Sequence, residues 1–144
     1  TNNIPLAIRL TGVLDSAALE AAWGDVVGRH ETLRTRYPDD GGSAHQEILA
    51  AVPARIDTAA VRDEALDAAM AAEAARGFRL ETELPWRATL YEISPAEHVL
   101  LIIVHHIAAD GWSMGVLMRD LSAAYTARAE GRTPDWAPLP VQYA

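Results

Sequence analysis

Two adjacent histidines end a long hydrophobic run in the stretch VHHIAADGW, at positions 104–112. His105 and His106 are followed by Asp110 and Gly111, where we expect the chain to turn into a helix. An imidazole accepts a proton from an amine or a hydroxyl near neutral pH. The N–H groups at a helix N-terminus favour a developing negative charge. This combination is typical of acyl transfer, in which such donors stabilise a tetrahedral oxyanion.

The two histidines cannot both enter one cleft if the strand continues through them. Successive residues of a β-strand point to opposite faces of the sheet. We therefore expect one of His105 and His106 to face the packed side and the other to face the open side. An aspartate at the end of a buried strand also needs a partner, because an unpaired buried charge is costly.

The residue types alone leave other interpretations open. A histidine after an apolar strand is commonly a hydrogen-bonded core or rim residue. Two histidines with Asp110 are also a possible metal-ligand set, but adjacent strand residues diverge and no further His or Glu lies nearby at ligand spacing. We therefore expect no metal site. A serine hydrolase is disfavoured, because Ser113 lacks the G-x-S-x-G motif.

Composition narrows the class of protein. The chain has 144 residues, of which 50% are hydrophobic and 22% charged, as in one ordinary globular domain. Its formal net charge of −8 disfavours nucleic acid and anionic membranes as partners, since both attract clusters of Lys and Arg. It has no cysteine and no apolar run long enough to span a membrane, so we expect a cytoplasmic protein. The chain begins without Met and stops abruptly, and we expect a fragment of a longer polypeptide.

Hydrophobic periodicity predicts interleaved helices and strands. Strands are predicted at 4–11, 33–37, 44–50, 86–93 and 98–106, the second and third forming a hairpin around the turn at 38–43. Helices are predicted at 16–30, 61–76 and 112–125, the first capped by Asp15 or Ser16. The strand at 98–106 is continuously apolar, which predicts burial on both faces and a central place in the sheet. The pattern indicates an α/β class, here an α+β two-layer sandwich with helices packed on a mixed sheet.

Two motifs resemble a known family. The sequence HHIAADGWSM is similar to the HHxxxDG motif of the condensation domains of nonribosomal peptide synthetases, which belong to the chloramphenicol acetyltransferase-like superfamily. The sequence RHETLRTRYP, at positions 29–38, resembles the second motif of these domains, with Tyr37 in place of the usual Phe. The stretches NIPLAIRLTGVLD and PLPVQYA also resemble flanking segments, so the resemblance covers essentially the whole chain.

The resemblance implies a fold, a reaction and partners. Such domains have two similar lobes around a tunnel, and residues 1–144 resemble the N-terminal lobe only, without the first motif or the C-terminal lobe. The implied reaction joins a donor acyl or peptidyl thioester to an acceptor aminoacyl thioester through a new amide bond. The implied partners are the donor and acceptor peptidyl carrier proteins, the chain's own C-terminal lobe and adjacent synthetase domains. No cofactor is expected in this lobe, because the substrates arrive on phosphopantetheine arms of the carrier proteins.

The resemblance also implies roles for individual residues. His106 matches the functional histidine, as a general base or as a positioner of the amine, and His105 is expected to pack the other way. Asp110 and Arg34 match a structural pair behind the histidine, so we expect Asp110→Ala to fail by misfolding. Gly111 is expected to supply a special backbone angle or to keep the tunnel clear.

The residues around these motifs carry weaker expectations. Trp112 and Ser113 are possible tunnel residues, although packing and helix capping explain them as well. Arg29 and His30 are expected to complement a helix dipole without a role in the chemistry.

The motif spelling distinguishes branches of the superfamily. Heterocyclisation domains resemble a DxxxxDxxS pattern, and oxygenase-recruiting domains change the second His and the final Gly, whereas this chain keeps HHxxxDG. Epimerisation domains often place Trp after the Ser, where this chain has Met114. The spelling favours the subtype that takes an L-configured donor. An epimerisation domain, an ester-forming acyltransferase and a non-catalytic docking lobe for carrier proteins remain the alternatives, and we expect the isolated chain to show no turnover.

Overall fold

A four-stranded mixed sheet forms the centre of the computed structural model, which describes residues 3–40, 43–44, 46–50, 52–80, 82–109 and 114–134. The strand order is β1 (Asn3–Thr11), β8 (Glu97–His105), β7 (Trp86–Ser94) and β6 (Asp57–Ala60). β8 pairs antiparallel with both β1 and β7, and β6 pairs parallel with β7. These pairings make β8 an inner strand, as its apolar run predicted.

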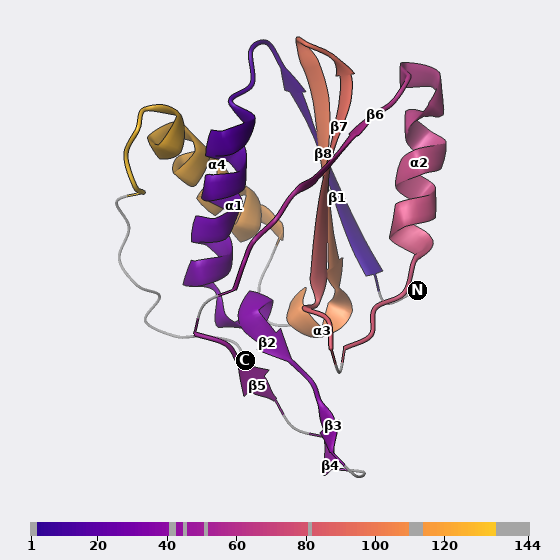
Figure 1. The fold of residues 1–144 in the computed structure, drawn as a ribbon, viewed down its shortest axis with the longest axis vertical. Coiled ribbons are helices and arrows are strands. Elements are labelled where there is room, and N and C mark those ends of the chain that lie inside the picture. Colours follow the sequence, from indigo (N-terminus) through magenta and orange to yellow (C-terminus); the bar gives the residue numbers. More distant parts are fainter. Residues whose placement is uncertain are drawn as a thin grey trace.

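Helices cover both faces of the sheet. Helices α1 (Ser16–Arg29) and α4 (Met114–Ala129) pack together on one face, and α2 (Asp63–Ala75) lies on the other (Figure 1). The predicted α/β class with helices on a mixed sheet is confirmed. The predicted two layers correspond to the sheet and the α1–α4 pair. The structure adds α2 on the other face of the sheet.

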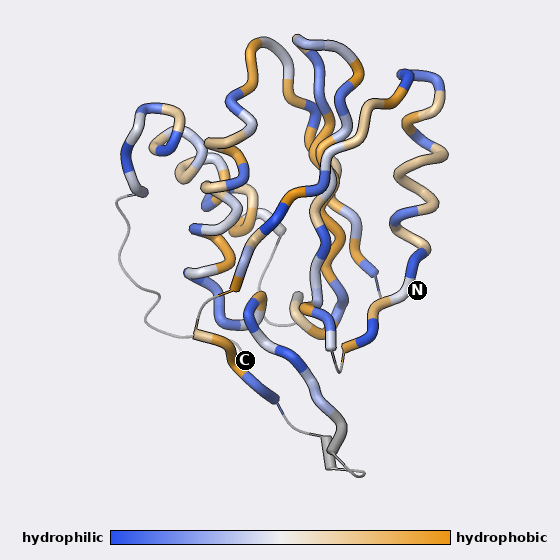
Figure 2. Tube along the Cα trace, viewed as in Figure 1, coloured by the Kyte–Doolittle hydropathy of each residue, from blue (hydrophilic) through white to orange (hydrophobic). Residues whose placement is uncertain are grey.

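β8 supplies apolar side chains to two hydrophobic clusters, one on each face. Its even-numbered residues, from Leu100 to Val104, pack with the α1 and α4 side, and its odd-numbered residues, from Val99 to Ile103, pack with the α2 side. In Figure 2 the apolar colouring runs along the strands, while α2 is mainly pale or hydrophilic. Only Leu66 of α2 is buried, so α2 buries fewer side chains against the sheet than the α1–α4 pair does.

Helix α1 follows its sequence signals closely. Asp15 is the N-cap, and its carboxylate accepts a hydrogen bond of 3.0 Å from the Ala18 N–H. The residues predicted to form its apolar stripe are all buried: Leu19, Ala22, Trp23, Val26 and Val27. Gly12 separates β1 from this helix with a φ of 91°, a backbone conformation that glycine adopts at little cost.

The segment after α1 differs from the predicted strand at 33–37. Residues Glu31–Arg34 form a 3₁₀ helix, η1, and only Thr35–Arg36 form a strand, β2. The Thr35 hydroxyl donates to the Glu31 carbonyl, and this local hydrogen bond favours the turn over an extended chain. The predicted hairpin is present in two short pieces: β2 pairs with β5 (Glu47–Ile48), and β3 (Asp39–Asp40) pairs with β4 (Ser43–Ala44).

Two further elements were not predicted. The strand at 98–106 was expected to include His106, but β8 ends at His105 and His106 begins the short helix α3 (His106–Ala109). The strand β6 was not predicted from the sequence, because all four of its residues are exposed and show no alternation of apolar and polar residues. Its place in the sheet comes from parallel pairing with β7, a contact between distant segments.

Candidate functional site

The change from strand to helix between His105 and His106 gives the two side chains different surroundings. His105 is the last residue of β8 and is partly buried, whereas His106 is the first residue of α3 and is exposed. α3 lies at the end of β8, next to the beginning of β7 (Figure 1). An exposed imidazole is therefore presented at the end of a buried central strand.

Contacts on three sides hold His105. Its backbone N–H donates to the Pro85 carbonyl at 2.8 Å, which fixes the end of β8 against the segment before β7. Its Nδ1 accepts a hydrogen bond of 3.1 Å from the Ile107 N–H. The Phe78 ring meets the imidazole edge to face, with ring centroids 5.9 Å apart and an interplanar angle of 83°.

These contacts favour a neutral His105. A ring nitrogen that accepts a hydrogen bond carries no proton, so this geometry corresponds to an imidazole protonated at Nε2 only. Burial lowers the pKa of His105, and the neighbouring His106 lowers it further. The neutral imidazole of His105 thus caps a backbone N–H in α3.

Arg34, the last residue of η1, links α1 to the residue that follows β5. Its Nε donates to the Val27 carbonyl at 3.2 Å, and its Nη1 donates to the Leu49 carbonyl. Its predicted partner Asp110 lies outside the described residues, as do Gly111, Trp112 and Ser113. The pairing of Arg34 with Asp110 and the roles of the other three residues remain predictions.

A buried carboxylate that was not singled out from the sequence links α4 to the end of α1. Asp120 is 7% exposed and lies 3.1 Å from Arg29 Nη1 and 2.7 Å from His30 Nε2. Arg29 and His30 are expected from the sequence only to complement a helix dipole, but in the structure both contact this carboxylate. The spacing of Asp120 on its helix gives no local signal for a contact 90 residues away in sequence.

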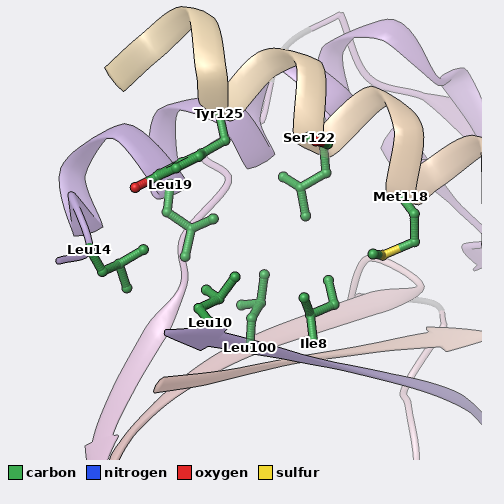
Figure 3. A pocket seen from close by; sticks show the side chains of 9 residues that line it. Ile8, Leu10, Leu14, Leu19, Leu100, Met118, Ser122 and Tyr125 are labelled. Atoms are coloured by element: carbon green, nitrogen blue, oxygen red, sulfur yellow. The ribbon is translucent and has the colours of Figure 1, made fainter. Parts of the chain in front are cut away.

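An apolar cavity lies away from the histidines. It has a volume of about 170 Å³ between α1, α4 and the strands β1 and β8 (Figure 3). Its strand β8 residue, Leu100, precedes His105 by five positions, or roughly 17 Å along a strand. Residues from both helices, both strands and the loop before α1 line it: Ile8, Leu10, Leu14, Leu19, Leu100, Met118, Leu121, Ser122 and Tyr125. The cavity is thus a gap in the helix–sheet packing, separate from the histidine site.

The described part of the chain holds neither a cluster of metal-ligating side chains nor a helix that could span a membrane. Within residues 3–134, leaving out the undescribed gaps, no group of three or more His, Cys, Asp or Glu side chains is placed to hold a metal ion. Among the same residues, no helix is both long and apolar enough to cross a membrane.

Comparison with known proteins identifies relatives over the whole chain. The family model described as "Condensation domain" matches residues 2–144. CymA of Salinispora arenicola, a probable nonribosomal peptide synthetase, is 51% identical over 144 residues, which are 100% of this chain and 2% of that protein. The chain spans only 2% to 6% of the length of the first curated relatives it matches.

Solved structures agree with this match. The X-domain from teicoplanin biosynthesis, in a complex with OxyB, superimposes with a TM-score of 0.93 at 47% identity. That match covers 99% of this chain and 31% of the other chain. The starter condensation domain of the rhizomide synthetase RzmA superimposes with a TM-score of 0.83 at 25% identity, covering 94% of this chain and 34% of the other.

Proposed function

Because the chain belongs to the condensation-domain family, we propose that it is the N-terminal lobe of a domain that forms peptide bonds in nonribosomal peptide synthesis. The observation that supports this most strongly is the exposed His106 at the end of the buried strand β8, within the HHxxxDG motif of that family. The donor acyl thioester and the acceptor aminoacyl thioester would each arrive on the phosphopantetheine arm of a peptidyl carrier protein. The lobe itself would bind no cofactor.

In the proposed reaction, the acceptor amine attacks the carbonyl carbon of the donor thioester. A C–N bond forms, the C–S bond breaks, and the donor arm leaves as a thiol after taking up a proton. The attacking nitrogen loses a proton on the way to the amide. A thioester is already activated, so positioning two tethered substrates accounts for much of the rate.

His106 has two possible roles in this reaction. As a general base it would take the proton from the amine, a role that contributes roughly 10²–10⁴ in rate. As a positioning group it would hydrogen-bond the amine and help to stabilise the tetrahedral intermediate. The exposure of His106 suits both roles, and the neutral His105 behind it suits a support for the backbone at this point.

The remaining residues of the motif have supporting roles in this proposal. Asp110 and Arg34 would hold the segment behind His106, and Gly111 would leave room for the acceptor arm. Trp112 and Ser113 would border the tunnel. The C-terminal lobe of the same domain would supply the other wall of the tunnel and most of the acceptor pocket. Adjacent synthetase domains would present the carrier proteins. The motif spelling favours an L-configured donor.

A docking function is the second candidate, and one specific observation favours it. The X-domain found in a complex with OxyB has a TM-score of 0.93 to this chain, higher than that of the RzmA starter condensation domain. In that case the lobe would recruit a partner protein instead of joining substrates. Both motif histidines are present in this chain, which supports the catalytic candidate over this one.

Substitution of His106 tests the catalytic proposal. Single-turnover acyl transfer between loaded carriers is measured with the protein that carries this chain and its second lobe, as wild type, His106→Ala and His106→Asn. If His106 is the base, both variants slow transfer by about 10²–10⁴. If it positions the amine, Asn keeps a hydrogen-bonding group and retains more activity than Ala. Full activity in both folded variants would contradict any role of His106 in the reaction.

A further inference from the structure

We propose that Arg87 and Phe78 are positioning residues that hold His105, and through it the backbone at His106, at the end of β8. The three side chains Arg87, Phe78 and His105 lie in a row, and we call them the Arg87 brace. The effect of the brace on turnover rests on the proposed function, whereas its effect on His105 does not depend on any reaction.

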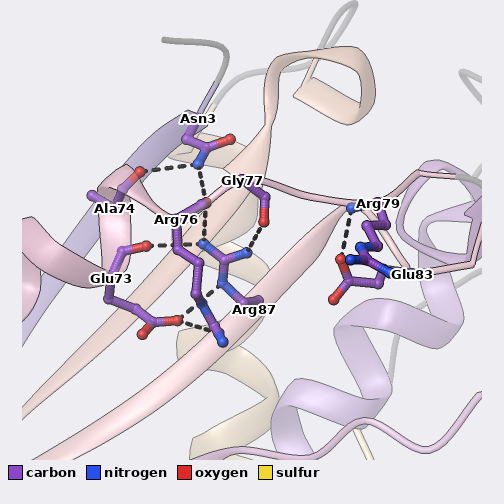
Figure 4. Close-up of polar contacts among 8 residues, drawn as sticks. All are labelled: Asn3, Glu73, Ala74, Arg76, Gly77, Arg79, Glu83 and Arg87. Atoms are coloured by element: carbon purple, nitrogen blue, oxygen red, sulfur yellow. Dashed lines mark hydrogen bonds and ion pairs between the residues drawn. The ribbon is translucent and has the colours of Figure 1, made fainter.

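Arg87 anchors the brace on carbonyl oxygens at the C-terminal end of α2 (Figure 4). Its Nη1 donates to the Gly77 carbonyl at 3.1 Å, and its Nη2 donates to the carbonyls of Glu73 at 2.9 Å and Arg76 at 2.7 Å. The last carbonyls of a helix have no partner within the helix, and α2 has no basic residue in its last turn. The guanidinium from β7 therefore closes the end of α2 and is itself fixed there.

A carboxylate and a second strand strengthen this anchor. The Arg87 side chain is 12% exposed, and its Nε lies 3.0 Å from Glu73 Oε1, which balances the charge of a largely buried guanidinium. Asn3 of β1 donates through Nδ2 to the carbonyls of Ala74 at 2.9 Å and Arg76 at 2.8 Å. Asn3 is also the residue paired with His105 in the β1–β8 register. The end of α2 is thus tied to both strands that border the histidine site.

The Phe78 ring contacts both the Arg87 guanidinium and the His105 imidazole. The Arg87 guanidinium carbon lies 4.1 Å from the centre of the Phe78 ring, an arrangement in which the cation attracts the face of the ring. The same ring meets His105 edge to face. Phe78 therefore lies between a fixed cation and the imidazole, which it confines on one side.

His105 connects the brace to the first turn of α3. Its Nδ1 accepts from the Ile107 N–H, so a rotation of the imidazole would break a hydrogen bond to the residue after His106. The titratable and charged groups near these contacts are His106 on α3, Arg87 on β7, Glu73 and Arg76 at the end of α2, and Glu83 before β7. The brace thus sets the direction of the backbone from which His106 projects.

Arg9 provides a matched control, because it is an arginine on another strand of the same sheet. It lies on β1 near the opposite end from the histidines, and its Nη1 pairs with Glu97 at 2.7 Å on the surface. The change Arg9→Met removes the same kind of side chain as Arg87→Met. It leaves the brace untouched.

Nuclear magnetic resonance of ¹⁵N-labelled histidine rings tests the brace in the protein that carries this chain, with His105→Asn used for assignment. In the wild type, His105 is expected to show an unprotonated Nδ1 and a titration midpoint below the ordinary histidine value. In Phe78→Leu and Arg87→Met, the midpoint is expected to rise and the two tautomers to mix. Phe78→Tyr, which keeps the ring, and the control Arg9→Met are expected to keep the wild-type signature.

Single-turnover transfer measures the consequence for the reaction. Phe78→Leu and Arg87→Met are expected to lower the single-turnover rate constant by up to about 100-fold, with little change in the carrier concentration that gives half of the maximal rate, because they misplace His106 without touching substrate. Phe78→Tyr, which keeps the ring, is expected to transfer at the wild-type rate.

The outcomes separate the brace from the proposed function. An unchanged His105 tautomer and titration in folded Phe78→Leu and Arg87→Met would overturn the brace. A wild type without transfer activity, in which the substitutions still alter His105, would overturn the proposed function and leave the brace standing. If Arg87→Met does not fold, Phe78→Leu decides the question, since it leaves the contacts of Arg87 with α2 in place.

Discussion

His105 and His106 are neighbours in sequence, yet the strand end between them gives them different surroundings. His105 is confined by the Phe78 ring and accepts a hydrogen bond through Nδ1, whereas His106 is exposed at the start of α3. Alternation along a strand predicted different environments for the two residues. It did not predict that a helix begins at His106, since the apolar pattern of β8 runs up to the histidines without a break.

The lowered pKa of His105 leads to a prediction about stability. In the unfolded chain this histidine titrates near its ordinary value of about 6.5, and in the folded protein it titrates lower. As the pH falls below about 6.5, the unfolded state takes up a proton before the folded state does. The free energy of unfolding therefore decreases.

The His105→Asn variant isolates this contribution. Asparagine can offer its amide oxygen to the Ile107 N–H and does not titrate, so the variant should lose part of the acid sensitivity of Tm below about pH 6.5. The difference in Tm between wild type and variant, measured across this range, isolates the contribution of His105. A difference in Tm that stays constant with pH would contradict the prediction.

Two aspartates form ion pairs at the α1–α4 interface, and their partners differ in exposure. The Asp120 side chain is 10% exposed and lies between Arg29 and His30, whereas the Asp25 side chain of α1 is 16% exposed and pairs with Arg128 of α4, which is 32% exposed. Removing one partner from a buried group of charges leaves the others uncompensated, while a pair near the surface contributes little.

We therefore expect Asp120→Asn to lower the free energy of unfolding by about 3–5 kcal/mol. The matched change Asp25→Asn, at the same helix interface, should cost less than Asp120→Asn, because its partner Arg128 is more exposed to water. Denaturant unfolding of both variants compares them directly. Equal losses would show that burial of Asp120 does not set the strength of its contacts.

Local signals predicted the elements that depend on local sequence. The capping aspartate, the apolar stripe of α1 and the uninterrupted run of β8 were each visible in the sequence, and the structure confirms them. The strand β6 and the 3₁₀ helix η1 were missed, because β6 depends on parallel pairing with β7 and η1 depends on a side-chain hydrogen bond from Thr35.

Contacts between distant segments explain why the sequence did not reveal the surroundings of the site. Arg87 lies between Trp86 and Ala88 in an alternating strand, so it had the pattern of an outward-facing charge. Only the fold shows that it contacts the end of α2 and the ring of Phe78. The motif histidines were found because their family pattern is local.

The sheet and its helices form one lobe in the proposed domain, and the reaction needs a second. His106 lies at the end of the sheet in an exposed position, so substrates on this side would need a further wall to exclude water and align the two thioesters. We expect the 144-residue chain alone to give no amide product when both loaded carriers are supplied, and product formed by this chain alone would contradict a two-lobe tunnel.

Intact mass of the acceptor carrier protein is the measurement to make first. The protein that carries this chain and its second lobe is mixed with a loaded donor carrier and a loaded acceptor carrier. We predict that the acceptor gains the mass of the donor acyl group and that the donor returns to its free thiol form. If both carriers stay loaded and no mass moves, this protein does not form the amide bond, and a docking or epimerisation role would replace the proposed function.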